Sequence, residues 1–419
     1  MKTAVVILNW NGEKYLKQFL APLLRSLKGY DAQVTVADNN SLDASVAYME
    51  STFGDKVRVL CLDRNYGFAE GYNRALAQIS ATYYLLLNSD VLVEADWLYA
   101  LEEWMDLHPD CAACGPKILS YAERDRFEYA GAAGGLMDRY GYSFCRGRVL
   151  GRTEKDEGQY DTPEDVFWCS GACMMVRAEA WKQLGGFDRE YFAHFEEIDF
   201  CWRARLEGWR ISYVPRSRVW HVGGGTLPQD SPWKLKLNFR NNLLTLRKNY
   251  ARTAALDLFF EMAATVATID NGGGDAWNCC YDSLREMPEE LLGELIDTAS
   301  RDGVKSGKRA VLRRMLLDGC SAVVYLLQGR KNAFKAVVEA HREYRKLEKA
   351  PDVGEEESCR NCIRGFLQRG DAGKMLSLNL EAGLGQKVKV KAMLDGWMVY
   401  RALHWKDQVH DRLNEEIPL

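Results

Sequence analysis

The sequence contains no long hydrophobic run, no dense cysteine framework and no strong excess of charge of either sign. Its 419 residues include 55 Lys and Arg against 59 Asp and Glu, a formal net charge of −4. This balance gives no reason to expect nucleic acid as a partner. The twelve cysteines are scattered, which is typical of a protein of the reducing cytoplasm. No apolar run reaches the length of a membrane span, and the first residues do not form a signal peptide.

The charge is unevenly distributed along the chain. Residues 301–347 carry twelve Lys and Arg and four Asp and Glu, a local net charge of +8. A basic helical stretch beside an acidic body is typical of a surface that meets anionic lipid. A solvated helix face would have the same composition, and the sequence leaves both interpretations open.

The first 115 residues alternate between strand and helix patterns. Short apolar runs predict strands, and apolar residues at helical spacing lie between them. The predicted strands are residues 3–8, 33–37, 57–61 and 83–87, and the predicted helices are residues 13–27, 43–52 and 67–79. This order predicts an α/β fold with a parallel sheet and helices on both faces. Ligands of such sheets bind outside the carboxyl ends of the strands.

Polar residues follow all four predicted strands. The four groups are Asn9-Trp10-Asn11-Gly12, Asp38-Asn39-Asn40-Ser41, Asn65-Tyr66-Gly67-Phe68 and Asn88-Ser89-Asp90. Each group alone is weak evidence for a ligand site, because Asn, Asp and Gly are ordinary loop residues. Four such groups at four consecutive strand ends favour a ligand site at this edge of the sheet.

The remaining chain is predicted in two parts. Residues 166–225 mix strands with helices, and the chain beyond residue 231 is mainly helical. The predicted elements are strands at 167–177 and 211–214, helices at 177–188, 194–209, 232–250, 253–269, 309–328 and 332–347, a glycine-rich loop at 220–225 and a linker at 350–358. Residues 359–419 are predicted to be further helix and carry no recognisable chemistry.

Seven motifs together resemble a known family. In chain order they are VVILNWNG, VADNNSLDAS, NYGFAEGYN, LLLNSDV, CSGACMMVRAEAWKQLGGFD, FAHFEEIDFCWRARLEGW and VWHVGGG. They resemble glycosyltransferase family 2, most of all the rhamnosyltransferase-like members of bacterial surface-polysaccharide biosynthesis. The resemblance covers residues 1–250 and returns at 309–346. It implies a GT-A fold with a helical C-terminal extension.

The resemblance also implies a division of the chain. Residues 1–115 would bind the nucleotide sugar, and residues 116–250 would bind the acceptor and carry out catalysis. Residues 251–349 would form a helical, basic, membrane-proximal region, and residues 350–419 a helical extension of unknown role. The expected location is the cytoplasm, on the inner face of the plasma membrane.

The implied reaction moves a sugar from a nucleoside-diphosphate donor, such as dTDP-rhamnose, to a hydroxyl of a saccharide or lipid-linked acceptor. A diphosphate leaving group needs charge stabilisation, which Mg or Mn can supply through oxygen ligands. Asp90 matches the last Asp of the family's DxD motif, in which Asn88 occupies the first position. His221 matches a later histidine that completes the metal shell, although a buried structural histidine would fit the sequence too.

The donor pocket is expected at the polar strand ends. Asp38 matches the residue that contacts the nucleobase, while an Asx turn before the next helix is the alternative. Gly67 would allow close approach to the donor, or it would simply start a helix. The expected donor-binding residues are Asn9, Asn11, Gly12, Asp38, Asn40, Asn65, Gly67, Phe68, Asn73, Asn88, Ser89 and Asp90.

The catalytic base is expected in the FEEID segment. Glu197 takes the position where family members usually have Asp, and Glu196 is the second candidate. Asp199 precedes Arg203 by four residues, which predicts an ion pair on the helix surface. A single positioned carboxylate implies inversion at the anomeric carbon. The expected acceptor-binding residues are Trp168, Gly171, Ala172 and His194, although Trp168 fits a core position equally well.

Two other functions remain open at this stage. A nucleotidyltransferase would share a similar sheet, but it would need a basic phosphate loop after the first strand, where Lys14 is the only nearby candidate. A non-catalytic nucleotide-sugar-binding protein would fit the departures at Asn88 and Glu197.

Overall fold

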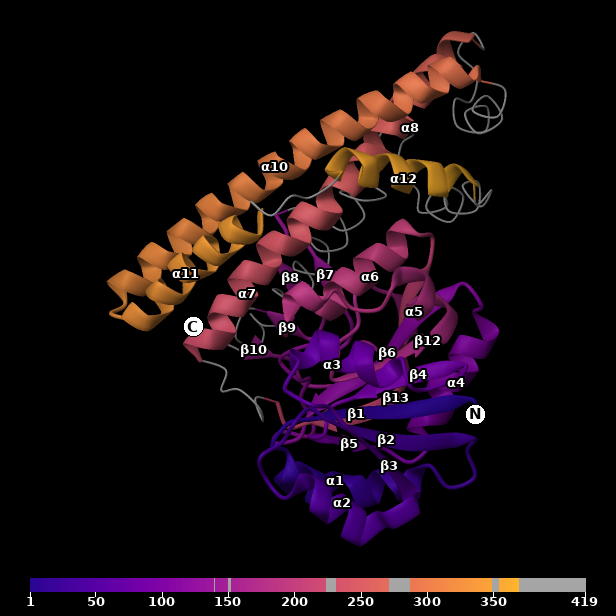
Figure 1. Ribbon diagram of the computed structural model, residues 1–419, viewed down its shortest axis with the longest axis vertical. Helices are drawn as coiled ribbons and strands as arrows, with labels where there is room; N and C mark the ends of the chain where they lie inside the picture. Colours follow the sequence, from indigo (N-terminus) through magenta and orange to yellow (C-terminus); the bar gives the residue numbers. More distant parts are fainter. Residues whose placement is uncertain (139, 150–151, 224–230, 271–286, 349–353, 369–419) are drawn as a thin grey trace.

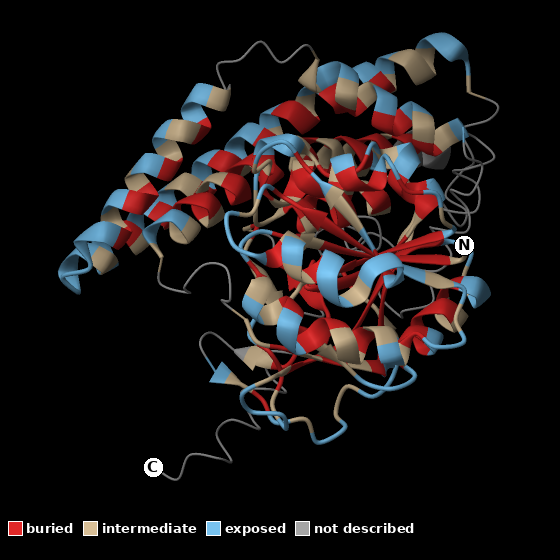
Figure 2. Ribbon diagram, turned by 60° about the horizontal axis from the view of Figure 1, so that its bottom comes forward, coloured by how far each residue is buried: buried red, intermediate tan, exposed pale blue. Residues whose placement is uncertain are grey.

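The computed structural model describes residues 1–138, 140–149, 152–223, 231–270, 287–348 and 354–368. An α/β body contains the central sheet, and a layer of long helices lies across one end of it (Figure 1). The central strands of the sheet are largely buried between helices (Figure 2), whereas its edge strands are partly exposed.

The predicted βαβαβαβ unit is confirmed. Its strands are parallel and lie in the order β4-β1-β2-β3, with a helix between each pair of consecutive strands. Its elements are β1 (Thr3–Asn9), α1 (Glu13–Ser26), β2 (Ala32–Asp38), α2 (Ser45–Phe53), the short helix η1 (Gly54–Lys56), β3 (Val57–Cys61), α3 (Gly67–Leu76) and β4 (Tyr83–Leu87). The apolar runs form strands because both faces of the sheet are covered.

The second half extends the same sheet with mixed strand directions. β12 runs antiparallel to both β4 and β6, β13 runs parallel to β6, and β5 and β11 pair with β13. Its elements are β5 (Val91–Val93), α4 (Trp97–Leu107), β6 (Cys111–Ser120), β11 (Glu164–Asp165), β12 (Cys173–Arg177), α5 (Ala178–Leu184), η2 (Arg189–Tyr191), α6 (Glu196–Leu206) and β13 (Arg210–His221). Two small hairpins join β7 (Gly135–Met137) to β8 (Ser143–Cys145) and β9 (Arg148–Val149) to β10 (Arg152–Thr153).

Two strand predictions differ from the structure. The strand predicted at 211–214 is the start of the twelve-residue β13, which continues to His221 through an irregularity in its pairing with β6. The predicted strand at 167–177 is shorter, because β12 begins only at Cys173. Trp220 and His221 therefore lie on a strand and not in a glycine-rich loop, whose residues 224 and 225 are outside the described residues.

The helical layer is more continuous than the sequence predicts. α7 (Pro232–Thr245), the π-helical turn η3 (Leu246–Tyr250) and α8 (Ala251–Asp270) form one uninterrupted run. The helix predicted at 309–328 is the second half of α10 (Glu289–Leu327), which packs on α8 and is followed by α11 (Lys331–Glu348) and α12 (Glu355–Gln368). α12 thus begins inside the predicted linker, and residues 369–419 are outside the described residues.

Glycines explain why α10 is longer than predicted. Gly303 and Gly307 weaken a sequence-based helix prediction. In the structure a Cβ at Gly303 would lie 2.6 Å from Cβ of Ala255, and a Cβ at Gly307 would lie 2.9 Å from Cβ of Ala251. The two glycines therefore let α10 and α8 approach closely, and this tertiary contact outweighs their low helix propensity.

Candidate active site

The ends of β4 and β13 bring an aspartate and a histidine together. Asp90 lies between β4 and β5, and β5 pairs with β13 so that Val91 lies opposite His221. Oδ1 of Asp90 lies 3.1 Å from Nε2 of His221, and Nδ2 of Asn88 lies 3.4 Å from the same nitrogen. Asp90 and His221 are both buried. Residues 131 positions apart in the sequence thus form one polar site at the carboxyl end of the sheet.

Glu128 is a third member of this group, and no motif in the sequence predicts it. Its Oε1 lies 3.6 Å from Nδ1 of His221, on the side of the ring away from Asp90. The side chain is buried, and its other oxygen accepts a hydrogen bond from the backbone N–H of Ala130. Glu128 therefore lies where it can orient the imidazole ring.

The electrostatic environment of His221 favours a positive charge. Burial alone lowers the pKa of His221, but the carboxylates of Asp90 and Glu128 outweigh it and raise that pKa from 6.5 to about 10. The same field would attract a metal cation at Nε2 in place of the proton. Two ligand atoms at right angles around a small divalent cation are roughly 3 Å apart, because each bond is about 2.1 Å long. The 3.1 Å between Asp90 and His221 fits this requirement.

Asp90 and His221 would supply only two protein ligands to a metal ion. Among the described residues, no group of three or more His, Cys, Asp or Glu side chains is arranged to hold a metal ion. Magnesium commonly binds through one or two protein ligands, with substrate phosphates and water completing its shell. The donor set of Asp90 and His221 is compatible with that arrangement.

Asp38 lies at the end of β2, opposite Asn9 of β1. Its Oδ1 accepts a hydrogen bond from Nδ2 of Asn9 at 3.0 Å, and its Oδ2 accepts one from the N–H of Ser41 at 2.9 Å. This bond closes a turn over residues 38–41, one residue longer than the Asx turn considered for Asp38, and it does not cap α2, which begins at Ser45. Each carboxylate oxygen has a second lone pair, so the turn leaves acceptor capacity at this strand end.

The loop after β1 is tied to the loop after β2. Oδ1 of Asn11 accepts a hydrogen bond from the N–H of Leu42 at 2.7 Å, and the Asn11 N–H donates to Oγ of Ser41. Asn11 and Asn40 both have positive φ angles, of 53° and 62°. A Cβ at Gly12 would lie 2.2 Å from Oδ1 of Asn9, so this position needs glycine for close packing.

The residues around the start of α3 contact the second half of the chain. Gly67 has a φ of +74°, and a Cβ there would lie 2.5 Å from the carbonyl oxygen of Phe192. The N–H of Phe68 donates to that carbonyl at 2.6 Å, and the N–H of Gly67 donates to Oδ1 of Asn65 at 2.8 Å. Asn73 exchanges two hydrogen bonds with the backbone of Phe187. The close approach made by Gly67 is therefore to residue 192.

Glu196 and Glu197 begin α6, and each has one buried carboxylate oxygen without a hydrogen-bond partner among the described residues. Burial, together with repulsion from Glu197, raises the pKa of Glu196 well above its usual value. Burial also raises the pKa of Glu197 from 4.5 to about 7, although backbone N–H groups at the helix start oppose this. A carboxyl group that gains and loses its proton near neutral pH suits general-base catalysis.

Glu197 lies close to the end of β4. A Cβ at Gly171 would be 4.0 Å from Cβ of Glu197 and 3.3 Å from the ring of Phe68. The next residue, Ala172, accepts a hydrogen bond at its carbonyl from the N–H of Asn88 at 2.9 Å. One short stretch of backbone thus separates Glu197 from the segment that carries Asn88, Ser89 and Asp90.

The two aromatic acceptor candidates are placed differently. Trp168 is buried, donates from Nε1 to the carbonyl of Leu136 at 3.0 Å and packs on Gly135, as a core residue does. His194 has a buried Nε2 without a partner among the described residues. Burial, with a contribution from Lys234, lowers the pKa of His194 to about 4, so its ring is neutral at pH 7.

Asp199 forms the expected ion pair with Arg203, at 2.7 Å, but the pair is not on the surface. Asp199 is 1% exposed and also accepts hydrogen bonds from Asn249 and Tyr191. These contacts join α6 to the helical layer. At Asp199 the helix α6 packs against η3, and the four-residue spacing of Asp199 and Arg203 in the sequence does not reveal this contact.

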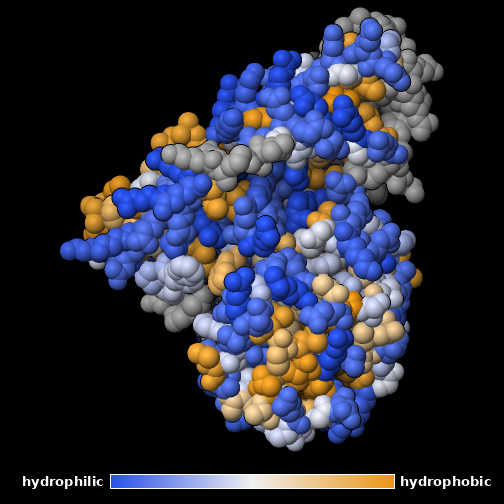
Figure 3. All heavy atoms as spheres, viewed as in Figure 1, coloured by the Kyte–Doolittle hydropathy of each residue, from blue (hydrophilic) through white to orange (hydrophobic). Residues whose placement is uncertain are grey.

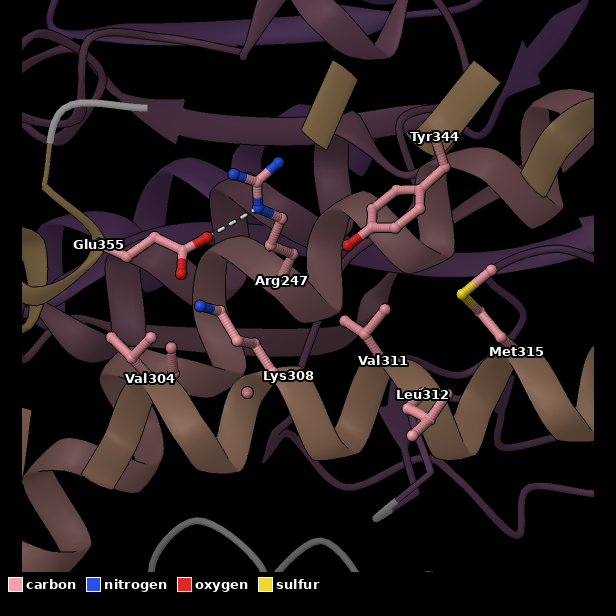
Figure 4. Close-up of a pocket in the computed structure, with 10 residues that line it drawn as sticks. Arg247, Val304, Lys308, Val311, Leu312, Met315, Tyr344 and Glu355 are labelled. Carbon is pink, nitrogen blue, oxygen red and sulfur yellow. Dashed lines mark hydrogen bonds and ion pairs between the residues drawn. The ribbon is translucent and has the colours of Figure 1, made fainter. Parts of the chain in front are cut away.

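A separate cavity of about 200 Å³ lies between η3, α10, α11 and α12 (Figure 4). Arg247 and Glu355 on its wall are paired with each other at 2.8 Å, and its floor is apolar, formed by residues such as Val304, Val311 and Met315. None of the residues assigned to donor, metal or base lines it, so it is distinct from the site at the strand ends.

Comparison with known proteins agrees with this architecture. The profile described as "Glycosyltransferase like family 2" matches residues 2–243. An N-acetylglucosaminyl-diphospho-decaprenol L-rhamnosyltransferase of Mycobacterium tuberculosis is 26% identical over 265 residues, which are 59% of this chain and 84% of that protein. The dTDP-rhamnosyl transferase RfbF of Shigella flexneri is 27% identical over 262 residues, 58% of this chain and 80% of RfbF. Rhamnosyltransferase WbbL of Escherichia coli is 27% identical over 188 residues, 42% of this chain and 69% of WbbL.

The match spans the whole central sheet and reaches into α7. The GT-A fold and the transferase activity expected from the sequence motifs are thereby confirmed. The chain belongs to glycosyltransferase family 2.

Proposed function

We propose that the protein transfers a sugar, with inversion, from a nucleoside-diphosphate donor to a hydroxyl group of a saccharide or lipid-linked acceptor in cell-surface polysaccharide synthesis. The observation that carries this proposal is the position of Glu197 beside Gly171, whose neighbour Ala172 is hydrogen-bonded to Asn88, two residues before Asp90. The names of the relatives support rhamnose as the sugar, dTDP-rhamnose as the donor and a lipid-linked acceptor.

Asp90 and His221 would hold a Mg or Mn ion, and Glu128 would orient the imidazole ring of His221. The ion, when bound, neutralises charge on the diphosphate leaving group. Asn88 would contribute its side-chain amide beside this pair, where many family members have a carboxylate. The buried position of Asp90 and His221 strengthens their interaction with a cation.

Glu197 would accept the proton of the attacking hydroxyl. Its unpartnered buried oxygen and its raised pKa both suit this role. Glu196 is the second candidate, and burial together with repulsion from Glu197 holds its pKa well above the usual value. Gly171, Ala172 and His194 would border the acceptor, with the neutral His194 ring available to contact a hydroxyl.

The nucleotide would lie over the ends of β1 and β2. Asp38, Asn9, Asn11 and Asn40 would contact the nucleoside there, while Asn65 and Phe68 shape the neighbouring wall. Gly12 and Ser89 lie beside each other, since a Cβ at Gly12 would be 3.3 Å from Oγ of Ser89, and both would border the donor at this edge. Asn73 would act indirectly, because both ends of its amide hold Phe187.

The test is transfer by Glu197→Gln, with Glu196→Gln as the matched control. We expect Glu197→Gln to lose transfer and to keep donor affinity, and Glu196→Gln to keep both. Turnover by Glu197→Gln at the wild-type rate would remove Glu197 from the mechanism. Release of pyrophosphate in place of nucleoside diphosphate would identify a nucleotidyltransferase. Donor binding without any transfer or donor hydrolysis would identify a binding protein.

The partner surface proposed for the basic region is an anionic bilayer, which would make the protein peripheral on the inner face of the plasma membrane. In the described residues, no helix combines the length and apolar character that crossing a bilayer requires. The second half of α10 instead exposes large apolar side chains along one face. They are Leu312, Leu316, Val323 and Leu327, each between 53% and 82% exposed.

Cations flank this apolar face, namely Arg309, Arg313, Arg330 and Lys331. Figure 3 shows hydrophobic surface at the end of the helical layer where α10 meets α11, with hydrophilic surface around it. Apolar side chains with flanking Lys and Arg suit the interface of an anionic membrane. In a symmetric dimer this face would meet its own copy, so that cations would face cations.

Vesicle flotation tests this surface. Wild-type protein should float with vesicles that contain anionic lipid at low salt, and high salt should weaken the binding. The double variant Leu316→Glu with Leu327→Glu should not float, whereas Leu107→Glu should float normally, because Leu107 is equally exposed on α4. Equal flotation of all three proteins would contradict the assignment, as would a dimer that only the double variant disrupts.

A further inference from the structure

The turn that precedes the two glutamates has an unfavourable backbone. Phe192, His194 and Phe195 have φ angles of +62°, +70° and +75°. Side chains other than glycine rarely adopt this left-handed conformation, and it persists only where surrounding contacts impose it. Three such residues among four, directly before Glu196, therefore need an external support.

Asn241 of α7 supports the turn through hydrogen bonds to its backbone carbonyls. Its side chain is wholly buried, and Nδ2 lies 3.0 Å from the carbonyl oxygen of Tyr191, 2.8 Å from that of Ala193 and 2.6 Å from that of His194. The two N–H groups of one amide thus serve three carbonyls among residues 191–194. These carbonyls would otherwise be difficult to satisfy away from water.

Arg240 fixes the direction of this amide. Nε of Arg240 donates to Oδ1 of Asn241 at 2.8 Å, which directs Nδ2 toward the turn. The guanidinium also donates to the carbonyls of Glu190 and Tyr191, at 2.9 and 2.8 Å. Two neighbouring residues of α7 therefore hold the backbone from residue 190 to residue 194.

The turn is held on its other side by α3. The carbonyl of Phe192 accepts from the N–H groups of Phe68 and Ala69, at 2.6 and 3.2 Å. α6 begins immediately after the turn, with Phe195 at its N-cap. A shift of the turn would thus move the first residues of α6, which include Glu196 and Glu197.

We propose that Asn241 is a positioning residue for catalysis: its amide, oriented by Arg240, holds the 192–195 turn in its left-handed form and so fixes the carboxylate of Glu197 toward the acceptor. This inference rests on the proposed function, in which Glu197 is the base. A displacement of about 1 Å in a catalytic group can cost on the order of 100-fold in rate.

Asn242 provides a matched control. It is the next residue of α7, is 1% exposed and donates from Nδ2 to the carbonyl of Gly141, which lies on a different loop. Loss of either amide removes a buried hydrogen-bond donor, so both Asn241→Ala and Asn242→Ala should lower the melting temperature, and Asn241→Ala should lower it more because three carbonyls lose their donor. Only Asn241→Ala should disturb the turn before Glu197.

The experiment measures kcat, the KM for the donor and the melting temperature of the full chain. We expect kcat of Asn241→Ala to fall about 100-fold, with the donor KM within about twofold of wild type. Asn242→Ala should keep kcat within about threefold. Equal kcat values for the two variants, measured well below both melting temperatures, would overturn the proposal.

Two further variants keep the test decisive if Asn241→Ala does not fold. Arg240→Gln changes a residue near the protein surface, and we expect about a tenfold loss of kcat with unchanged donor KM. A kcat of Arg240→Gln equal to that of wild type would contradict the role proposed for Arg240 in orienting Asn241. Glu197→Gln separates the two hypotheses: if it retains turnover, the base assignment fails, whereas an inactive Glu197→Gln with a fully active Asn241→Ala refutes only the role of Asn241.

Discussion

Replacing Glu197 by Gln should remove activity and at the same time stabilise the protein at alkaline pH. Burial raises the pKa of this carboxyl from 4.5 to about 7. The folded chain therefore binds the proton more tightly than the unfolded chain does. Its contribution to stability is complete below pH 4.5 and is lost as the pH rises through about 7, since the ionised group is then desolvated in the folded state.

The size of this effect follows from the pKa difference. Each pKa unit corresponds to about 1.4 kcal/mol, so ionised Glu197 costs about 3 kcal/mol at pH 8. Gln has a similar shape and no charge. Glu197→Gln should accordingly raise the free energy of unfolding by about 2–3 kcal/mol at pH 8 and by less than about 1 kcal/mol at pH 5.

Denaturant unfolding at pH 5 and pH 8, together with a transfer assay, measures both consequences. Glu196→Gln is the control, because burial also raises the pKa of Glu196 and this variant should gain stability at pH 8 while it keeps transfer. A Glu197→Gln protein with the wild-type pH dependence of stability would refute the argument that the carboxyl is desolvated. A stabilised but fully active variant would refute its role as base.

Three more predictions follow from the site. Asp90→Asn should abolish the stabilisation of the protein by manganese with donor in a thermal-shift assay, and an unchanged shift would exclude Asp90 as a ligand. Gly67→Ala should lower the free energy of unfolding by about 1–3 kcal/mol in denaturant melts, because alanine is strained at a φ of +74° and its Cβ would meet the carbonyl of Phe192. The pH profile of kcat/KM should rise with a midpoint near pH 7, as Glu197 loses its proton, and a flat profile down to pH 5 would argue against a base with a raised pKa.

The sequence predicts the sheet well because its strands are buried on both faces. Continuous apolar runs such as Tyr83–Leu87 leave little choice between strand and loop, and polar residues directly after them mark the ligand edge. The family motifs identify Asp90, His221 and the FEEID segment as candidate site residues. Their meeting in space depends on β13 reaching residue 221, which the predicted four-residue strand did not include.

Long-range contacts explain what the sequence did not predict. Glu128 is one glutamate in a loop rich in small residues, and it becomes part of the site only because β13 places His221 beside it. Asn241 lies in an ordinary helical pattern, and its role depends on carbonyl groups 47 to 50 positions away. Gly303 and Gly307 indicate a helix break by propensity alone, whereas Ala251 and Ala255 provide the small surface that they pack against.

The product of a single reaction shows whether the protein is an inverting transferase with Glu197 as its base. Purified protein, dTDP-rhamnose, manganese and a lipid-linked saccharide acceptor would be incubated, and the products would be examined by NMR and chromatography. We expect release of the nucleoside diphosphate and a new glycosidic bond of inverted anomeric configuration, both absent with Glu197→Gln. Retained configuration, or the same product formed by Glu197→Gln, would contradict this mechanism.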